Sequence, residues 1–187
     1  MMKIFLSEEA LSLVKNNHIF VDTCVFLDLA SLKKDDRDEF ENKLLQFTKQ
    51  GSIFVTVEPV VVEFYLGSSQ ADLKIKKSYI NHLIESTLPV RVLNKIVLDS
   101  LIVEYGRYAR GNVSYTDLCL GVAVKQFPNS LVLTRNYKDF PLKIFDCRAV
   151  FTLHLNRETR AYCFYSYRGL IKKKRAKIRE EKDNIPF

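Results

Sequence analysis

The sequence contains few residues that interrupt regular structure. Its 187 residues include only 6 Gly and 5 Pro, and no long tract is biased towards one residue type. These absences exclude a collagenous chain and argue against general disorder. With 47% hydrophobic and 12% aromatic residues the chain can bury a sizeable core, and its length fits one domain with an appendage.

Long hydrophobic runs are also absent. Every apolar run is interrupted within roughly 18 residues, the length that a membrane-spanning helix needs. The opening segment MMKIFLSEE becomes acidic too early for a secretory signal. The sequence therefore predicts a cytoplasmic protein with no membrane partner.

Motifs for several common kinds of site are missing. The cysteines form no C-x-x-C pair and the histidines no H-E-x-x-H motif, which disfavours a zinc site or a disulfide framework. No G-x-G-x-x-G or G-K-[ST] motif is present, which argues against a dinucleotide or P-loop nucleotide site. An aspartyl phosphatase would need a second Asp two positions after Asp22, where Cys24 stands. We interpret the following as ordinary core or surface residues: Cys24, Cys119, Cys147, Cys163, His18, His82 and His154.

The charge of the chain is unevenly distributed. The net charge is +7, yet residues 1–156 hold 19 Lys and Arg against 18 Asp and Glu, whereas residues 157–187 hold 10 against 4. We therefore interpret 157–187 as a basic C-terminal tail. Such a segment favours a polyanion such as RNA, bound through its phosphates, although a solvated helix face has the same composition. The tail residues expected to contact nucleic acid are Lys172, Lys173, Lys174, Arg175, Lys177 and Arg179.

Short β-branched and aromatic runs alternate with stretches of helical periodicity. The runs predict buried strands at 19–21, 53–55, 90–93, 131–133 and 143–145, and the periodic stretches predict helices at 25–32, 39–49, 59–66, 73–84, 96–105 and 118–127. Such alternation is typical of a mainly parallel sheet with helices on both faces. The sequence thus predicts a three-layer α/β/α fold with about five strands over residues 18–156, preceded by a helical leader at 1–17.

Acidic residues follow several of the expected strands, at the sheet edge where parallel sheets bind ligands. Asp22 ends the first strand, Glu63 lies in the helix after the second, Asp117 begins a helix, and Asp139 follows the strand at 131–133. Asp22 and Glu63 stand among apolar residues with no Lys or Arg nearby in the sequence, so we expect them to be buried and to share a divalent cation. Oxygen ligands favour Mg²⁺ or Mn²⁺. Taken singly, Asp22 or Asp117 also suits a helix N-cap, and Glu63 an exposed helix position.

Four segments carry a resemblance to a known family. They are HIFVDTCVFL at 18–27, VEPVVVEFYLG at 57–67, YTDLCLGVA at 115–123 and LVLTRNYKDF at 131–140. In this order they resemble the successive motifs of PIN-domain ribonucleases, over about residues 18–146. The catalytic and metal-binding residues that the resemblance implies are Asp22, Glu63, Asp117 and Asp139, and the supporting polar residues are Thr23, Thr134 and Asn136.

The chain also departs from the family pattern. Cys24 stands where the family often has Asn or Ser, which places one hydrogen bond of the first motif in question. The leader and the basic tail extend beyond the compact toxins of toxin–antitoxin pairs. Arg135, beside the cluster in sequence, is a candidate for contact with substrate phosphates.

Two functions follow as predictions. The first is a Mg²⁺- or Mn²⁺-dependent endoribonuclease, with the toxin of a toxin–antitoxin pair, and hence an antitoxin partner, as one form of it. The second is a non-catalytic PIN-fold module that binds RNA or serves as a scaffold through its basic tail. The apolar residues of 73–84 and 96–105 exceed what one sheet face covers, so we also expect a homodimer. The sequence leaves the RNA substrate, its cleavage specificity and the number of metal ions open.

Overall fold

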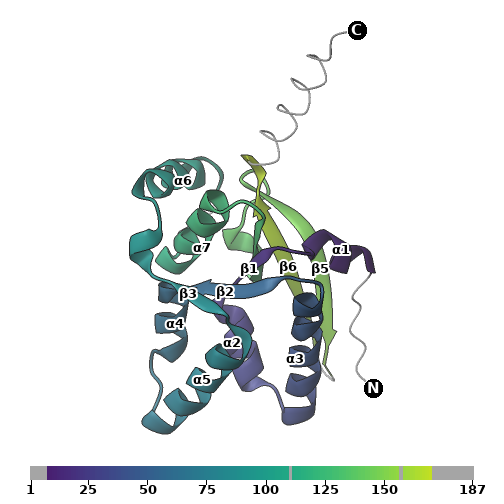
Figure 1. Cartoon of the computed structure of the whole chain (residues 1–187). Helices are drawn as coiled ribbons and strands as arrows, with labels where there is room; N and C mark the ends of the chain where they lie inside the picture. Colours follow the sequence, from purple (N-terminus) through teal and green to yellow (C-terminus); the bar gives the residue numbers. More distant parts are fainter. Residues whose placement is uncertain (1–7, 110, 156–157, 170–187) are drawn as a thin grey trace.

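The computed structural model describes residues 8–109, 111–155 and 158–169. These ranges contain seven α-helices and one six-stranded sheet (Figure 1). None of the helices in them is both long enough and apolar enough to span a bilayer. The six basic tail residues at 172–179 lie outside the described residues.

The sheet combines parallel and antiparallel strands in the order β3-β2-β1-β4-β6-β5. Strands β1, β2, β3 and β4 run parallel, whereas β6 is antiparallel to both β4 and β5. The α/β class and the mainly parallel sheet that we predicted are confirmed. The strands are β1 (His18–Val21), β2 (Ile53–Val57), β3 (Ser86–Leu88), β4 (Ser130–Thr134), β5 (Phe145–His154) and β6 (Thr159–Tyr167).

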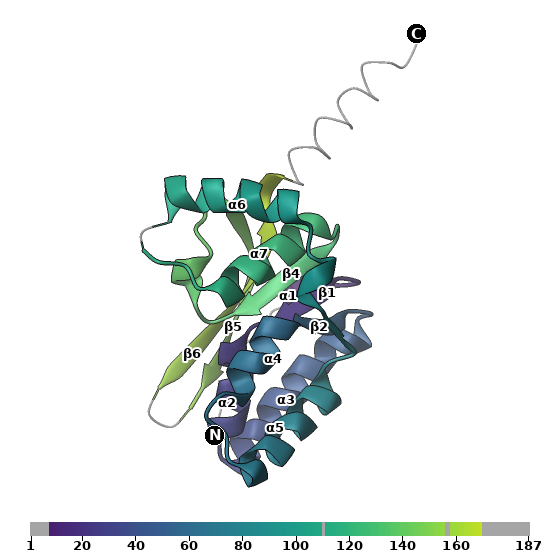
Figure 2. The ribbon, with the colours of Figure 1, turned by 90° about the vertical axis from the view of Figure 1, so that its left-hand side faces the viewer.

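Helices cover both faces of the sheet. Helices α6 and α7 lie on one side, and α2, α3 and α5 lie on the other (Figure 2). The helices are α1 (Glu8–Val14), α2 (Thr23–Ser31), α3 (Lys34–Lys49), α4 (Glu58–Tyr65), α5 (Gln70–Leu83), α6 (Lys95–Tyr108) and α7 (Tyr115–Gln126), with short 3₁₀ turns η1 (Val90–Val92) and η2 (Tyr137–Asp139). The arrangement is that of a three-layer α/β/α fold.

Burial along the strands follows from their place in the sheet. Strand β4 is buried at every position and β1 at all but the first, because both are central and are covered on two faces. Edge strand β5 instead alternates buried with more exposed positions over much of its length. The central pair β1 and β4 therefore forms a rigid base for whatever follows its carboxyl ends.

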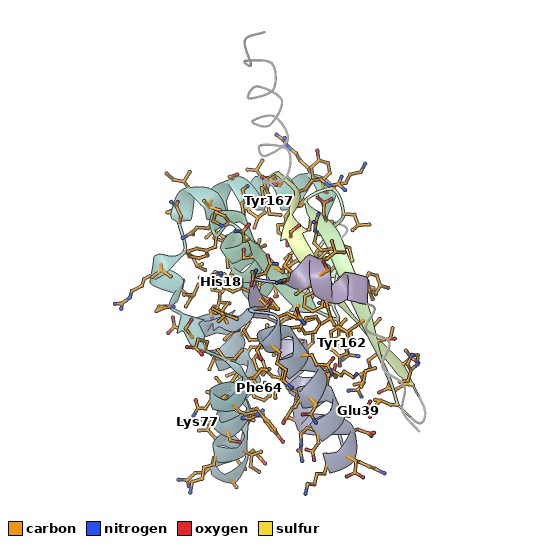
Figure 3. All side chains as sticks on the ribbon, turned by 45° about the vertical axis from the view of Figure 1, so that its right-hand side comes forward. His18, Glu39, Phe64, Lys77, Tyr162 and Tyr167 are labelled. Atoms are coloured by element: carbon orange, nitrogen blue, oxygen red, sulfur yellow. The ribbon has the colours of Figure 1, made fainter. Side chains whose placement is uncertain are left out.

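An aromatic cluster fastens α3 to the antiparallel part of the sheet. Phe47 of α3 contacts Phe164 of β6 with ring centroids 5.0 Å apart, and Phe40 contacts Tyr162 at 4.9 Å. Phe151 of β5 stacks on Tyr162, also at 4.9 Å. Figure 3 shows Tyr162 among these side chains, between the strands and α3. The cluster makes β5 and β6 part of the main core.

The sheet therefore extends beyond the expected domain boundary at residue 156. Thr159–Tyr167, which we had placed in the basic tail, forms β6 between β4 and β5, so the sheet has six strands in place of about five. The charge count had grouped Arg160 with the lysine-rich segment that follows. The structure shows that aromatic residues of β6 on both faces are buried, which gives this segment a place inside the sheet.

The strand expected at 90–93 is wrong. Ser86–Leu88 forms the edge strand β3, and Val90–Val92 forms η1. Pro89 separates the two with φ −63° and has no backbone N–H for a strand ladder, so pairing ends there. The N–H of Val90 instead donates to Glu58 Oε2 at 3.2 Å.

Candidate functional site

Asp22 follows β1 directly and is 5% exposed. It occupies the N-cap position of α2, but its side chain makes no capping hydrogen bond. Its Oδ2 accepts hydrogen bonds from Thr134 Oγ1 at 2.6 Å and from Cys24 Sγ at 3.1 Å. Thr134 reaches Asp22 because β1 and β4 pair in parallel, with Val21 opposite Leu133. The Asp22 carboxylate is thus held at the carboxyl ends of the two central strands.

Cys24 forms a hydrogen bond to Asp22 through its thiol. Its thiol donates to Asp22 and accepts a hydrogen bond from the backbone N–H of Arg135 at 3.2 Å. Burial, followed by the charge of Asp22, raises the pKa of the Cys24 thiol well above its ordinary value. The sulfur therefore stays protonated at neutral pH and remains a donor to the carboxylate.

Glu63 is exposed, which contradicts the burial that we expected. Helix α4 buries Val60 and Phe64, and these two positions define its inner face; Val62 lies with Glu63 on the outside. The residues around Glu63 are apolar on nearly every side of the helix, so their spacing did not show which side would be buried. Glu63 still belongs to the site, because its Oε2 accepts a hydrogen bond from Thr23 Oγ1 at 2.9 Å.

Asp117 stands in the first turn of α7 and is buried. Ser114 is the N-cap of this helix: its Oγ accepts from the Asp117 N–H at 3.0 Å and donates to Asp117 Oδ2 at 2.5 Å. Asp117 therefore follows the N-cap and is not the cap itself. The sequence analysis did not single out Ser114, although its spacing of three residues before an acid is typical of a capping box.

Asp139 ends η2 and is half-buried. Its Oδ2 accepts a hydrogen bond from the Asn136 side-chain amide, and the Asn136 N–H donates to Thr134 Oγ1 at 2.8 Å. Tyr105 of α6, which the sequence analysis missed, donates its hydroxyl to the Asp139 carbonyl at 2.8 Å. Thr134, Asn136 and Tyr105 together position the segment that carries Asp139.

The four carboxylates influence one another. Burial, followed by the charges of Asp22, Asp139 and Glu63, raises the pKa of Asp117 to about 7. Burial likewise raises the pKa of Asp22, with a smaller contribution from Glu63. Among the described residues, no ion pair joins any of the four to a Lys, Arg or His. The structure thus brings all four predicted acids into one neighbourhood of uncompensated negative charge, which we call the carboxylate cluster.

A fifth acid, Asp28 of α2, is equally buried but fully paired. It is 4% exposed and forms ion pairs with Arg160 at 2.7 Å and with Arg135 at 3.0 Å. The Tyr162 hydroxyl donates to its Oδ2 at 2.7 Å. Asp28 could not be identified from the sequence, because its partners Arg160 and Tyr162 come from β6, more than 130 residues later. Arg135, expected to contact substrate phosphates, instead directs its guanidinium at Asp28.

The oxygen donors of the carboxylate cluster suit a hard divalent cation in chemistry. Two of the four acids are buried without a basic partner, a condition that a cation relieves. In the part of the chain that the structure describes, however, no three His, Cys, Asp or Glu side chains are arranged as a ready coordination shell. Each carboxylate is turned towards its own hydroxyl, thiol or amide donor. The residues suit Mg²⁺ or Mn²⁺ by the type of their donor atoms, but their side chains as described do not form a coordination site.

A groove of about 410 Å³ lies beside the cluster. Its walls are mostly apolar, and Tyr115, at the start of α7, is 54% exposed next to it. The groove is lined by Glu58, Pro59, Val62, Glu63, Leu66, Val90, Tyr115 and Thr116. Glu63 belongs to both, so the groove adjoins the carboxylate cluster at this residue.

Comparisons of the chain with protein-family models, with curated proteins and with solved structures found no match. The functional interpretation therefore rests on the geometry of the carboxylate cluster and on the four sequence motifs.

Proposed function

We propose that the protein is a divalent-metal-dependent endoribonuclease of the PIN type. One observation carries the proposal: three acids from three other segments, Asp22, Glu63 and Asp139, gather around the buried Asp117, and their charges add to burial in raising its pKa. In the described residues no Lys or Arg is paired with any of the four. Without a cation, bringing these carboxylates together would not stabilise the fold, because like charges repel and burial disfavours the ionised form. The proposal gives them a shared function.

In this proposal Asp22, Glu63 and Asp117 hold Mg²⁺ or Mn²⁺, and Asp139 acts through water or on a second ion. When bound, such a cation activates a water for in-line attack on a phosphodiester and stabilises the departing oxyanion. Asp22 and Asp117 would hold the cation in their deprotonated forms; without a cation, burial and repulsion by nearby acids raise their pKa values. Thr134 and Cys24 fix the Asp22 carboxylate in the meantime.

The groove beside Glu63 favours a single-stranded substrate. An exposed tyrosine on an apolar wall offers a stacking surface for an unpaired base, and stacking of this kind contributes about 1–3 kcal/mol per base. Tyr115→Ala is expected to raise the KM for single-stranded RNA roughly tenfold. Tyr115→Phe keeps the ring and serves as the matched control, with a KM near that of the wild type.

The deciding experiment is a cleavage assay on single-stranded RNA. We expect cutting with Mg²⁺ or Mn²⁺, none with chelator, and none by Asp22→Asn or Asp117→Asn. Undiminished cutting by both variants would refute the assignment. RNA binding without cleavage would favour the second prediction, a non-catalytic RNA-binding module.

The homodimer, the antitoxin partner and cytoplasmic localisation stay predictions. The exposed Ile96, Ile102 and Val103 of α6 are compatible with a dimer surface. Light scattering would detect the dimer.

A further inference from the structure

Arg135 lies in the chain between two residues that hold the carboxylate cluster. Thr134 donates to Asp22, and Asn136 donates its side-chain amide to Asp139. The backbone N–H of Arg135 itself donates to Cys24, the other donor to Asp22. The backbone of Arg135 therefore lies between the residues that hold two of the four carboxylates.

The guanidinium of Arg135 nevertheless does not pair with the cluster. Its Nε lies 3.0 Å from Asp28 Oδ2, and its Nη2 donates to Asp28 Oδ1 at 3.2 Å. The side chain is 44% exposed, so packing alone does not fix it in this direction. The two contacts with Asp28 hold the Arg135 guanidinium in this direction.

Asp28 is a rigid acceptor. It is buried on α2, and Arg160 Nη1 and the Tyr162 hydroxyl each donate to it at 2.7 Å from β6. Arg160 also pairs with Glu158, which keeps it in place. The carboxylate of Asp28 is thus fixed by β6 whether or not Arg135 is present.

Release of Arg135 would change the carboxylate cluster. Arginine stays charged at every accessible pH and forms bidentate pairs with carboxylates. A guanidinium released from Asp28 would therefore pair with another carboxylate, and Asp22 and Asp139 are held by the residues on either side of Arg135. It would then neutralise negative charge that a divalent cation needs and would occupy its oxygen ligands. The direction of the Arg135 side chain therefore determines whether the carboxylate cluster can bind a metal ion or is paired with Arg135.

We propose that Asp28 is a positioning residue that keeps the Arg135 guanidinium out of the carboxylate cluster and so keeps the cluster available to a divalent cation. The role rests on the proposed function, because it presumes that the cluster binds Mg²⁺ or Mn²⁺. It differs from a purely structural role for Asp28 in one respect: it acts through Arg135 alone.

The test is a Mn²⁺ titration of the full chain, followed by the electron paramagnetic resonance signal of free Mn²⁺. Asp28→Asn is expected to weaken Mn²⁺ binding roughly 5- to 20-fold, the effect of a positive charge brought a few ångströms closer to a divalent ion. Arg135→Ala should bind within about twofold of the wild type. The double variant Asp28→Asn/Arg135→Ala should recover wild-type affinity, because no guanidinium is left to enter the cluster.

Tyr162→Phe is the matched control. It removes another donor to Asp28 but leaves the pair with Arg135, so Mn²⁺ affinity should stay at the wild-type value even if thermal stability falls. Should Asp28→Asn fail to fold, Asp28→Ser removes the same charge in a smaller side chain and allows the same comparison.

Two results would overturn the role of Asp28: wild-type Mn²⁺ affinity in the single Asp28 variant, or a double variant that binds as weakly as that single variant. The second result would mean that loss of Asp28 acts through general distortion. A wild-type chain that binds no Mn²⁺ would overturn the proposed function and the positioning role with it, and this outcome is distinct from the other two.

Discussion

Asp22 and Asp28 stand less than two helical turns apart, and both are almost fully buried, yet their surroundings are opposite. Asp28 has two arginines and a tyrosine hydroxyl, all within 3.0 Å. Among the described residues, the side-chain donors to Asp22 are a hydroxyl and a thiol, and other acids lie nearby. The contrast shows that buried carboxylates of similar exposure differ in whether they have a cationic partner, and the proposed function concerns those without one.

The largest expected effect concerns Asp117, which, like Asp22, is a buried acid without a cationic partner among the described residues. Asp117→Asn should lower the rate of Mn²⁺-dependent RNA cleavage by roughly 10³-fold, because a ligand and its charge are lost while the shape is kept. The measurement is the initial rate on a single-stranded RNA at saturating Mn²⁺. Asp99→Asn, which alters an exposed acid of α6 paired with Lys95, is the control and should cut at the wild-type rate.

Asp28, the buried acid paired with two arginines, should contribute more to the stability of the fold than Asp22. Asp28→Ala leaves the largely buried Arg160 with the more exposed Glu158 as its remaining ion-pair partner among the described residues, and is expected to lower the free energy of unfolding by up to about 3–5 kcal/mol. Asp22→Asn removes an unpaired buried charge and should leave the metal-free protein as stable as before, or more stable. Urea unfolding in chelator measures both. Equal destabilisation by the two variants would break the contrast between Asp22 and Asp28.

The pH dependence of stability should report on Asp117. Its pKa in the folded protein, about 7, lies above the ordinary value of 3.8, so the folded state holds the proton more tightly. The stabilisation is complete below pH 3.8 and is lost as the pH rises to about 7, at up to about 1.4 kcal/mol per pH unit. Metal-free wild type should therefore lose stability relative to Asp117→Asn between pH 5 and pH 7.5. A constant difference between the two unfolding free energies would contradict the raised pKa.

The smallest expected effect concerns the outermost acid. Asp139 is half-buried and is held by Asn136 and, through its carbonyl, by Tyr105. Asp139→Asn should slow cleavage only about tenfold, because a role through water or on a second ion is less direct than that of Asp117. Single-turnover rates for the two Asn variants give the comparison. A loss as large as that of Asp117→Asn would make Asp139 a principal ligand.

Much of the fold was predictable from local patterns. The strands β1, β2 and β4 are continuous apolar runs because they are covered on two faces, and the acids after β1 and β4 could be placed at the sheet edge from that fact alone. Helix α7 likewise begins where Ser114 and Asp117 stand at capping spacing. Local signals sufficed where one element determines the position of a residue.

The remaining features depend on partners that are distant in the sequence. The pairing of Asp28 with Arg160 joins residues far apart in the chain, and no local pattern encodes it. The exposure of Glu63 depends on which side of an apolar helix meets α2, a choice made by the contact of Phe64 with Phe26. Strand β6 was missed because the charged residues near its ends made the segment resemble a polar tail. Its central aromatic residues are buried because β4 and β5 flank the strand.

The long separation between Asp22 and its donor Thr134, 112 positions along the chain, has a kinetic consequence. Strand β1 is synthesised well before its neighbour β4, and pairing across such a distance along the chain is slow. Thr134 can hold the Asp22 carboxylate only after β4 has docked on β1. If the protein is the nuclease proposed above, incomplete chains and early folding intermediates have no activity towards RNA, and the time at which β4 docks sets the moment at which cutting can begin.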